Sequence, residues 1–463
     1  MYKYKILTIS QVIDSEKEFI DKNSRKKIFH IASNQILNFI NKKFRNEKIL
    51  FICGNGNNGK DGTETSKLIK NKQAFHYKVN FTDDIKFEKL KKLILKCDVI
   101  FDCIFGVGIN RKLDIKFLHL ISLINNSKKR IISIDLPSGF DGDTGQSHGG
   151  FINAEETLVM GFYKPAHFLL PAKQHMGNIS LINLGLKPPK TLIPNIQLIN
   201  KKMIDINSKI FKIDINKYHK GHVIVIGGKM PGASYIVAKS ARKIGAGLST
   251  VAIDKANLQF YNIKDYGTIL DIYKKKSLND KNVLVIGPGL GKKYSVNKIE
   301  DILKNFKKPI IIDADAISIF KDNKKRFYSL LKKKDNVVLT PHFGEFNRIF
   351  EYKKKKSKIF NCLAASKLIN NPVVLKGNDT VVAFPDERVY VDYGTSNSLA
   401  TAGTGDMLCG LISGLIAQGY QIKKSILSAI LIQRIISHTK NKTIVEDFIE
   451  LIPKVLNLLK KNN

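Results

Sequence analysis

The sequence is poor in cysteine, poor in acidic residues and free of long hydrophobic runs. Its five cysteines are an odd number and include no CxxC pair, which argues against a disulfide framework and against a zinc site. No charged start leads into an apolar run near Met1, and no apolar stretch is long enough to cross a membrane. We therefore expect a cytoplasmic protein with reduced thiols, no signal peptide and no membrane partner.

Motifs of several common protein classes are also missing. The chain contains no HExxH, no GxSxG, no zinc-finger spacing and no RNP-like segment, so metalloproteases and serine hydrolases have no support. The chain has 40 acidic residues and 77 lysines and arginines, which gives a net charge of +37. The lysines form short scattered runs without interleaved aromatic residues, so we expect a solvated basic surface and no nucleic-acid partner.

A chain of 463 residues normally folds as two domains. Short β-branched runs alternate with amphipathic stretches, a pattern typical of parallel strands that are buried on both faces. The expected strands are Ile49–Cys53, Val99–Phe105, Ile131–Leu136, Val223–Ile226, Val283–Ile286, Ile310–Ile312, Val337–Leu339 and Val373–Leu375. Three prolines between Leu186 and about Lys202 indicate a linker. The sequence therefore predicts two successive three-layer α/β domains, 1–203 (including the linker from about 187) and 204–463.

A Gly-Thr-Gly turn followed by one carboxylate begins an apolar helix in the second half, within LATAGTGDMLCG. The backbone N–H groups of Gly403, Thr404 and Gly405 could bind phosphate oxygens, with the helix dipole favouring their charge. Asp406 could then take a proton from an attacking hydroxyl. The simpler interpretation is a structural helix start, with Thr404 as the N-cap and Asp406 in the first turn.

A second glycine-rich segment, GNGNNGKDGT, follows the first expected strand. It contains GxGxxG, a common pattern, and nearly matches a phosphate-binding P-loop. Asp61 stands where a P-loop needs Ser or Thr, however, and its carboxylate would repel phosphates. In a third interpretation, the oxygens of Asn57, Asn58 and Asp61 bind a cation or a polar ligand. Asp102 and Asp135 end the next two expected strands, which favours this interpretation, although Asp, Pro and Gly after strands are also ordinary turn residues.

Residues from about Ile9 to Leu186 resemble the NAD(P)H-hydrate epimerase family, which carries Asn-Asn-Gly-x-Asp-Gly, Asp-x-x-x-Gly-x-Gly and Asp-x-Pro-Ser-Gly segments in this order. The resemblance implies a Rossmann-like fold, with K+ held by Asn58, Asp102 and Ser138. It also implies that Asp135 acts as acid or base at the nicotinamide ring. The implied substrate-binding residues are Asn57, Asn58, Gly59, Lys60, Asp61, Gly106, Val107, Gly108, Ile109, Asn110, Arg111, Lys112 and Asp135.

Two departures from this family pattern stand out. Lys60 replaces the usual second glycine, and it would be strained if its position required a positive φ. Phe29–Ser33 replaces the Met-Glu-x-Ala-Gly stretch of the N-terminal helix, which places His30 where the family has glutamate. Lys164 with Pro165, after Gly161, does fit the family's Lys-Pro segment.

The second half, from about Asp205, resembles the ADP- or ATP-dependent NAD(P)H-hydrate dehydratases, a branch of the ribokinase-like kinases. The motifs, in family order, are NKYHKGHVIVIGG, PGAS, GPGLG, DADA, TPHFGEF, LKGNDT and AGTGD. The resemblance implies that Asp406 is catalytic and that Mg2+ takes part. The implied hydrated-nucleotide site is Ala233, Gly289, His342 and Asp406, and the implied ADP or AMP site is Lys376, Gly377, Asn378, Asp379, Thr380 and Gly405.

Together, the two resemblances predict a bifunctional repair enzyme and a homo-oligomer. The first domain would interconvert the R and S epimers of hydrated NADH or NADPH, and the second would dehydrate the S epimer at the expense of ADP, giving AMP and phosphate. The choices between ADP and ATP and between NADH and NADPH stay open. So do two alternatives, a hydroxymethylpyrimidine- or hydroxyethylthiazole-type kinase with a non-catalytic nucleotide-binding first domain, and a non-catalytic binding protein.

Overall fold

The computed structural model describes residues 2–69, 74–82, 84–109, 111–204, 216–262, 265–291, 294–394, 396–439 and 444–461. The chain forms two compact units, Met1–Gln197 with Lys355–Lys358, and Leu198–Lys354 with Ile359–Asn463. The division lies within the predicted linker. That segment is not wholly irregular, because it contains strand β8 (Asn195–Leu198), which pairs antiparallel with β1 (Lys5–Ile6).

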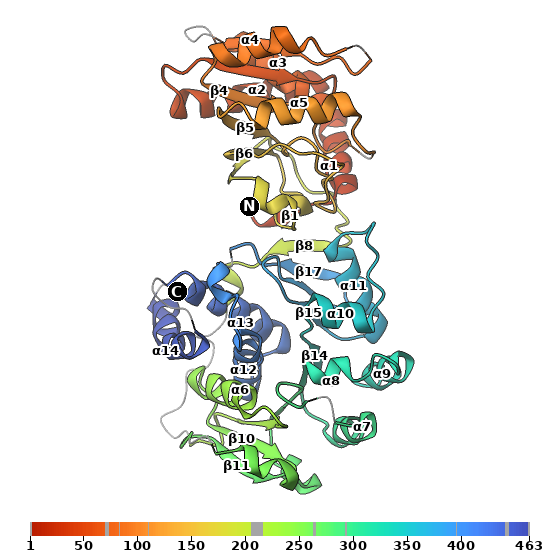
Figure 1. Ribbon diagram of the computed structural model, residues 1–463, viewed down its shortest axis with the longest axis vertical. Helices are drawn as coiled ribbons and strands as arrows, with labels where there is room; N and C mark the ends of the chain where they lie inside the picture. Colours follow the sequence, from red (N-terminus) through yellow and green to blue (C-terminus); the bar gives the residue numbers. More distant parts are fainter. Residues whose placement is uncertain are drawn as a thin grey trace. The chain divides into compact units, whose positions relative to one another are not determined.

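The first unit is a three-layer α/β sandwich around a parallel sheet with the order β3-β2-β4-β5-β6-β7 (Figure 1). The strands are β2 (Ile49–Cys53), β3 (Ala74–Lys78), β4 (Val99–Cys103), β5 (Arg130–Ile134), β6 (Glu156–Met160) and β7 (Asn178–Ile182). Because parallel strands end at the same sheet edge, the loops after β2, β4 and β5 meet there.

Alternate residues of the strands supply two apolar cores, one on each face of this sheet. Phe51 and Phe101 pack toward helices α1 (Ile9–Lys22) and α2 (Arg25–Lys43). Leu50 and Ile100 pack toward α4 (Phe87–Lys96) and α5 (Ile115–Asn125). The period of two along each strand therefore produces the double-sided burial that the sequence pattern predicts.

Helix α3 (Asn57–Leu68) begins directly at the paired asparagines, so these residues form a helical turn rather than a loop. Two close backbone contacts require glycine here. A Cβ on Gly54 would lie 2.0 Å from the carbonyl oxygen of Ile104, and one on Gly59 would lie 1.9 Å from that of Gly54. Lys60 is a helical residue and is not among those with positive φ, so replacing a glycine at this position causes no backbone strain.

The second unit is also a three-layer sandwich, with the strand order β17-β16-β15-β14-β13-β12-β9-β10-β11. The strands are β9 (His222–Ile226), β10 (Leu248–Ile253), β11 (Ile269–Ile272), β12 (Val283–Ile286), β13 (Ile310–Ile312), β14 (Val337–Leu339), β15 (Val373–Leu375), β16 (Val381–Ala383) and β17 (Arg388–Val391). Pairing is parallel from β11 to β15 and antiparallel for β16 and β17.

Helices cover both faces of this second sheet (Figure 1). One group is α6 (Pro231–Lys243), α12 (Thr404–Ala417), α13 (Ile422–Ser437) and α14 (Val445–Lys461), which share one large apolar core. The other group is α7 (Val296–Asn305), α8 (Asp315–Ser318), α9 (Lys324–Lys332), α10 (Phe343–Ile349) and α11 (Lys358–Ile369). Helix α12 is buried from Met407 to Ala417, as its apolar sequence predicts.

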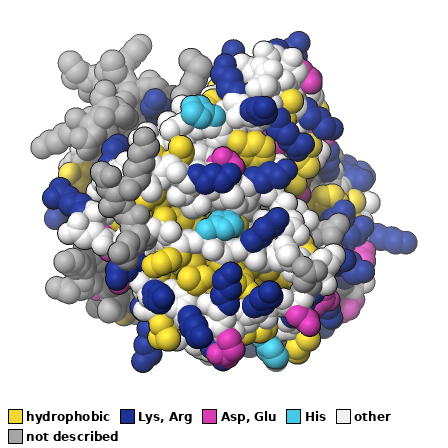
Figure 2. All heavy atoms as spheres, turned by 90° about the horizontal axis from the view of Figure 1, so that it is seen from above, with side chains coloured by type: hydrophobic (Ala, Val, Ile, Leu, Met, Phe, Trp, Pro, Cys, Tyr) yellow, Lys and Arg dark blue, Asp and Glu magenta, His cyan; other side chains and the backbone are white. Residues whose placement is uncertain are grey.

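Two observations concern the surface. Figure 2 shows lysine and arginine side chains dispersed over the face that it draws, with fewer acidic ones among them, in keeping with the net charge of +37. Among the described helices, none combines the length and the hydropathy that a membrane span needs.

Candidate active sites

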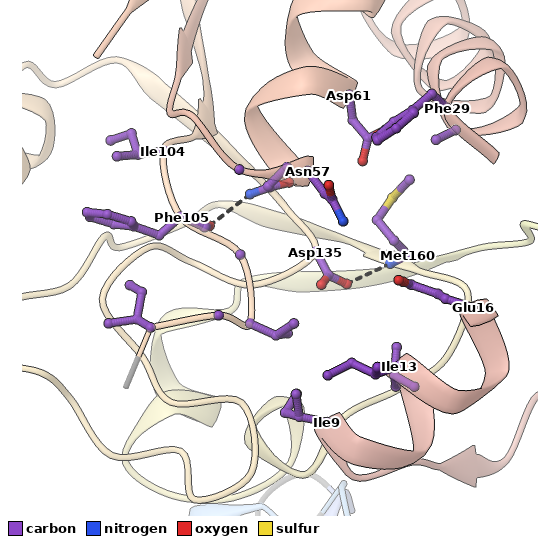
Figure 3. A pocket seen from close by; sticks show the side chains of 18 of the residues that line it. Ile9, Ile13, Glu16, Phe29, Asn57, Asp61, Ile104, Phe105, Asp135 and Met160 are labelled. Carbon is purple, nitrogen blue, oxygen red and sulfur yellow. Dashed lines mark hydrogen bonds between the residues drawn. The ribbon is translucent and has the colours of Figure 1, made fainter. Parts of the chain in front are cut away.

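A cavity of about 460 Å³ opens at the carboxyl edge of the first sheet (Figure 3). Ten of the residues predicted to bind the hydrated nucleotide line it, namely Asn57, Asn58, Asp61, Gly106, Val107, Gly108, Ile109, Arg111, Lys112 and Asp135. Apolar residues of α1 and α2, among them Ile9, Ile13 and Phe29, form the opposite wall. The cavity therefore combines a broad apolar surface with a few polar groups, as ligand sites do.

Three of the residues predicted to bind the hydrated nucleotide are not among those that line this cavity. Lys60 does not line the cavity, which corrects that prediction. Its exposed side chain lines a separate groove together with His30, and its Nζ lies 5.8 Å from the centre of the Phe29 ring. Gly59 is buried against Gly54 and supports the cavity from behind. Asn110 lies outside the described residues.

Because Lys60 is helical and lies outside the cavity, Lys60→Gly should leave the epimerisation predicted from the sequence nearly unchanged. The variant restores the family's glycine but places it in the first turn of α3, where the loss of backbone restriction should cost about 0.5–1 kcal/mol of stability. Denaturant unfolding of the purified variant measures the second effect. A large loss of epimerase rate in a folded variant would contradict the position of Lys60.

Asp135 is held in one orientation by three neighbouring groups. Its backbone adopts φ 66°, and its Oδ1 accepts hydrogen bonds from the backbone N–H of Met160 at 3.0 Å and from the ammonium of Lys164. The Lys164 side chain is only 1% exposed, so this is a buried ion pair. His167 donates from Nε2 to the carbonyl of Asp135 and accepts at Nδ1 from the N–H of Lys164. Burial, and then the charge of Lys164, lower the pKa of His167 to about 4, so it is neutral.

Two of the other carboxyl groups that line this cavity interact electrostatically with each other and with Asp135. Asp61 points in from α3 and Glu16 from α1 (Figure 3). Burial raises the pKa of Asp61 well above its usual value, with Asp135 and Glu16 adding to the effect. The Oδ1 atom of Asp61 is buried and has no hydrogen-bond partner among the described residues. The site thus pairs an ion-paired carboxylate, Asp135, with a carboxyl group that favours its protonated form.

The three residues predicted to bind K+ lie together beneath this cavity. Ser138 donates from Oγ to Oδ1 of Asp102 at 2.6 Å, and its Oγ accepts the N–H of Phe105 at 2.9 Å. Asn58 donates from Nδ2 to the carbonyl of Phe105 at 2.8 Å, which leaves its buried Oδ1 without a partner among the described residues. An unpaired buried amide oxygen beside a carboxylate and a hydroxyl is a donor set that suits a hard cation.

The predicted catalytic residue of the second unit, Asp406, lies in a buried charge cluster. Lys376 donates from Nζ to both oxygens of Asp313, at 2.7 and 2.9 Å. Burial raises the pKa of Asp406 to about 7, with Asp313 and Glu345 adding to this effect and Lys376 opposing it. The pKa of Glu345 is likewise raised to about 7 by burial and by Asp313. Two carboxyl groups here therefore change charge near neutral pH.

Helix α12 begins as a phosphate-binding turn would. Gly403 is its N-cap at φ 87°, no side chain caps the helix, and Thr404 donates instead to the carbonyls of Leu399 and Thr401. The interpretation of Thr404 as the N-cap is therefore wrong. A Cβ on Gly405 would lie 3.2 Å from Nζ of Lys376, so the turn lies directly against this cation. Uncapped amides beside a lysine form an anion site.

A cavity of about 140 Å³ adjoins this turn. Five of the six predicted nucleotide-binding residues line it, namely Lys376, Gly377, Asn378, Thr380 and Gly405, whereas the buried Asp379 does not. The residues predicted to hold the hydrated nucleotide lie outside it. Ala233 and Gly289 adjoin each other, since a Cβ on Gly289 would lie 3.1 Å from that of Ala233.

His342 joins the cluster from the loop after β14. It caps α10 by accepting at Nδ1 from the N–H groups of Gly344 and Glu345, and its Nε2 lies 3.2 Å from Oε1 of Glu345. Burial, followed by the charge of Lys376, lowers the pKa of His342. A neutral His342 would therefore donate from Nε2.

The sequence predicts no role for Glu16, Asp313 or Glu345, although the last two lie in the DADA and TPHFGEF motifs. A signal existed for Asp313, a carboxylate that directly follows the expected strand Ile310–Ile312, whereas Glu345 lies farther along, beyond the loop that follows Val337–Leu339. Glu16 carried no such signal, because Asp14 and Glu18 on the same helix are equally acidic.

Comparison with known proteins finds relatives for both units. A family model described as NAD(P)H-hydrate dehydratase matches residues 223–452, and one described as YjeF-related protein N-terminus matches residues 67–166. The chain is 31% identical over 450 residues to the bifunctional NAD(P)H-hydrate repair enzyme Nnr of Dictyoglomus turgidum, covering 85% of each chain. It is 27% identical over 405 residues to the enzyme of the same name from Escherichia coli, covering 80% of this chain and 76% of that protein.

Among solved structures, a ribokinase-like superfamily protein from Enterococcus faecalis matches with a TM-score of 0.50 and 22% identity, over 57% of this chain and 96% of the other. This similarity shows the fold of the second unit and no more. Two α/β units with a separate polar site in each define a two-site enzyme. The chain belongs to the family of bifunctional NAD(P)H-hydrate repair enzymes.

This result confirms the family, the two fold classes and the bifunctional enzyme predicted from the sequence. The epimerase and dehydratase interpretation is favoured over a small-molecule kinase with a non-catalytic first domain.

Proposed function

We propose that the first cavity epimerises hydrated NADH or NADPH at C6, and that the second site dehydrates the S epimer at the expense of ADP or ATP. The observation that carries the proposal is the pairing of two buried acid-base sites in one chain, Asp135 with Lys164 in the first unit and Asp406 beside Lys376 in the second. Each site supplies a proton acceptor next to a fixed cation, as proton transfer and phosphoryl transfer both require.

In the second site, Asp406 accepts the proton of the C6 hydroxyl while that oxygen attacks the terminal phosphate of the nucleotide. Lys376 and the amides at the start of α12 bear the developing negative charge. The phosphate then leaves C6 as a proton leaves C5, which restores the C5–C6 double bond of the dihydronicotinamide, and with ADP the other products are AMP and phosphate. Proton transfer, positioning and electrostatic stabilisation thus all come from residues around one turn.

Magnesium would be held in this site by Glu345 and Asp313 together with the nucleotide phosphates. The described residues contain no group of three or more His, Cys, Asp or Glu side chains that could hold a metal by themselves. Magnesium normally binds through one or two carboxylates together with substrate phosphates. When bound, it would neutralise phosphate charge.

Potassium would be held in the first unit by Asn58, Asp102 and Ser138, where it would fix the loops that line the cavity. Replacing K+ with tetramethylammonium should therefore lower epimerisation and leave dehydration of the S epimer unchanged. K+ should also raise the melting temperature of the wild-type protein, because a ligand bound only to the folded state stabilises it. Both effects should vanish in Asn58→Ala, and a K+ response of equal size in that variant would place the ion elsewhere.

The direct test of the proposed function supplies both epimers of hydrated NADH with ADP or ATP, Mg2+ and K+, and follows the return of NADH absorbance. Complete recovery would support both activities. If only the NADH that corresponds to the S epimer returned, the second site would be an active dehydratase and the first site would be inactive as an epimerase. Phosphorylation of the substrate without elimination would instead indicate a kinase. A cytoplasmic location and a homo-oligomer stay predictions.

A further inference from the structure

The carboxyl group of Glu16 lines the first cavity and has no part in the proposed site so far. It points from α1 toward Asp135, while Asp61 points in from α3 (Figure 3). Three carboxyl groups from three separate elements therefore surround the space that the hydrated ring would occupy. Among the described residues, Glu16 has neither a hydrogen bond nor an ion pair, whereas Asp135 is fixed by Lys164 and Met160.

The position of Glu16 is set by how α1 is anchored. Thr8 and Gln11 form a capping box at the start of the helix, and the N–H of Ile9 donates to Oδ1 of Asp143 at 2.9 Å. At the next turn, Ser15 donates from Oγ to the carbonyl of Lys187 at 2.6 Å. Glu16 lies one turn after the buried Val12, on the same side of the helix, and so it faces the cavity.

We propose that Glu16 is a second proton-transfer residue of the epimerase site, acting on the hydrated ring together with Asp135. This proposal rests on the epimerase function proposed above for the same cavity. It adds a residue from the N-terminal helix to a site otherwise built from the loops after the strands.

The proton balance of epimerisation calls for two such groups. Asp135 takes the proton of the C6 hydroxyl as the C6–N1 bond breaks, the electron pair passes to N1, and N1 takes a proton from Glu16. The opened ring then carries an aldehyde at C6, which can rotate. When N1 adds back to the other face, its proton returns to Glu16 and the new hydroxyl recovers its proton from Asp135. No atom is lost and no redox partner is needed.

The charges around Glu16 suit it to the role of proton donor. Burial raises its pKa, with Asp135 adding to this effect and Lys164 and Arg25 opposing it. Glu16 therefore keeps its proton to a higher pH than an exposed glutamate does. It is also only partly buried, so its proton can be exchanged with solvent between turnovers.

The test measures conversion of the R into the S epimer by the full chain, in the absence of nucleotide. Glu16→Gln should lower kcat about 10²–10⁴-fold with little change in KM, the range typical of lost general acid catalysis. Glu16→Asp should retain part of the rate. Asp14→Asn makes the same change from carboxyl to amide on the exposed side of the same helix and should behave as wild type. Dehydration of the S epimer, which belongs to the second unit, should be equal in all four proteins, and a wild-type thermal unfolding curve checks that the first unit of each variant is folded.

The pH profile separates catalysis from a structural role. Wild-type kcat should fall at high pH as Glu16 loses its proton, and this decline should be absent from the residual activity of Glu16→Gln. Wild-type kcat in Glu16→Gln would overturn the role of Glu16 while leaving the epimerase function intact. A wild-type protein that does not interconvert the epimers would instead overturn the proposed function itself.

Discussion

Replacing Asp406 with alanine should lower the rate of NADH recovery from the S epimer about 10²–10⁴-fold, because the C6 hydroxyl loses its proton acceptor. The fold should persist. Burial already disfavours the ionised form of Asp406 and raises its pKa to about 7, so the native structure gains nothing from this charge. Initial rates with purified S epimer, ADP and Mg2+ measure the effect. Full turnover in the variant would refute the assignment of Asp406.

The raised pKa also gives the pH dependence a definite sign. A base with a pKa of about 7 must lose its proton to work, so wild-type dehydration should rise with pH through this value. Stability should move in the opposite direction. Because the pKa of Asp406 is lower in the unfolded chain, its ionisation favours unfolding between about pH 4 and pH 7. The melting temperature of Asp406→Ala relative to wild type should therefore be higher at pH 8 than at pH 4.

A matched control separates the chemistry of Asp406 from a general effect of removing a carboxylate near a helix start. Glu446 is an exposed acidic residue in the first turn of α14. Glu446→Gln should alter stability by no more than about 1 kcal/mol, through the helix dipole, and leave dehydration unchanged. A comparable loss of turnover in this control would mean that removing any acidic charge near a helix start lowers the rate, so that the slow dehydration by Asp406→Ala would not show a role in proton transfer.

The sequence predicts the first and last residues of a strand closely where an unbroken apolar run ends at a turn residue. Ile49–Cys53 and Val283–Ile286 are continuous apolar runs that end at glycine, and the structure has the same bounds. Strand β6 escaped prediction because Glu156 and Thr157 interrupt its apolar pattern. Both are buried, and Glu156 pairs with Lys43 of α2, a contact that no local window contains.

In the candidate sites, too, some residues could be predicted from short motifs and others could not. Motif residues such as Asp135 and Asp406 could be found because short segments place them just after a strand or at a helix start. Their partners could not be found so easily. Asp313 and Lys376 are 63 positions apart and meet only because β13 and β15 lie on either side of β14 in one parallel sheet. Which acidic residue of α1 faces the cavity depends on how that helix is anchored, and local sequence does not determine this.

Replacing Asp135 with asparagine should lower epimerisation about 10²–10⁴-fold and leave dehydration of the S epimer intact. This single variant also leaves the buried ammonium of Lys164 without its counter-charge, which should destabilise the first unit by about 3–5 kcal/mol. Loss of activity alone could then reflect unfolding rather than chemistry.

The double variant Asp135→Asn with Lys164→Met resolves this ambiguity, because it removes both charges of the pair. Methionine fills most of the volume of the lysine stem, and replacing a buried ion pair by uncharged groups is often neutral for stability. Thermal unfolding should therefore return toward the wild-type curve while epimerisation stays lost. If activity returned together with stability, Asp135 and Lys164 would be structural partners, and the proton transfer would have to be assigned to Glu16 and Asp61. If activity stays absent in the stable double variant, the ionised carboxylate itself is needed for the reaction.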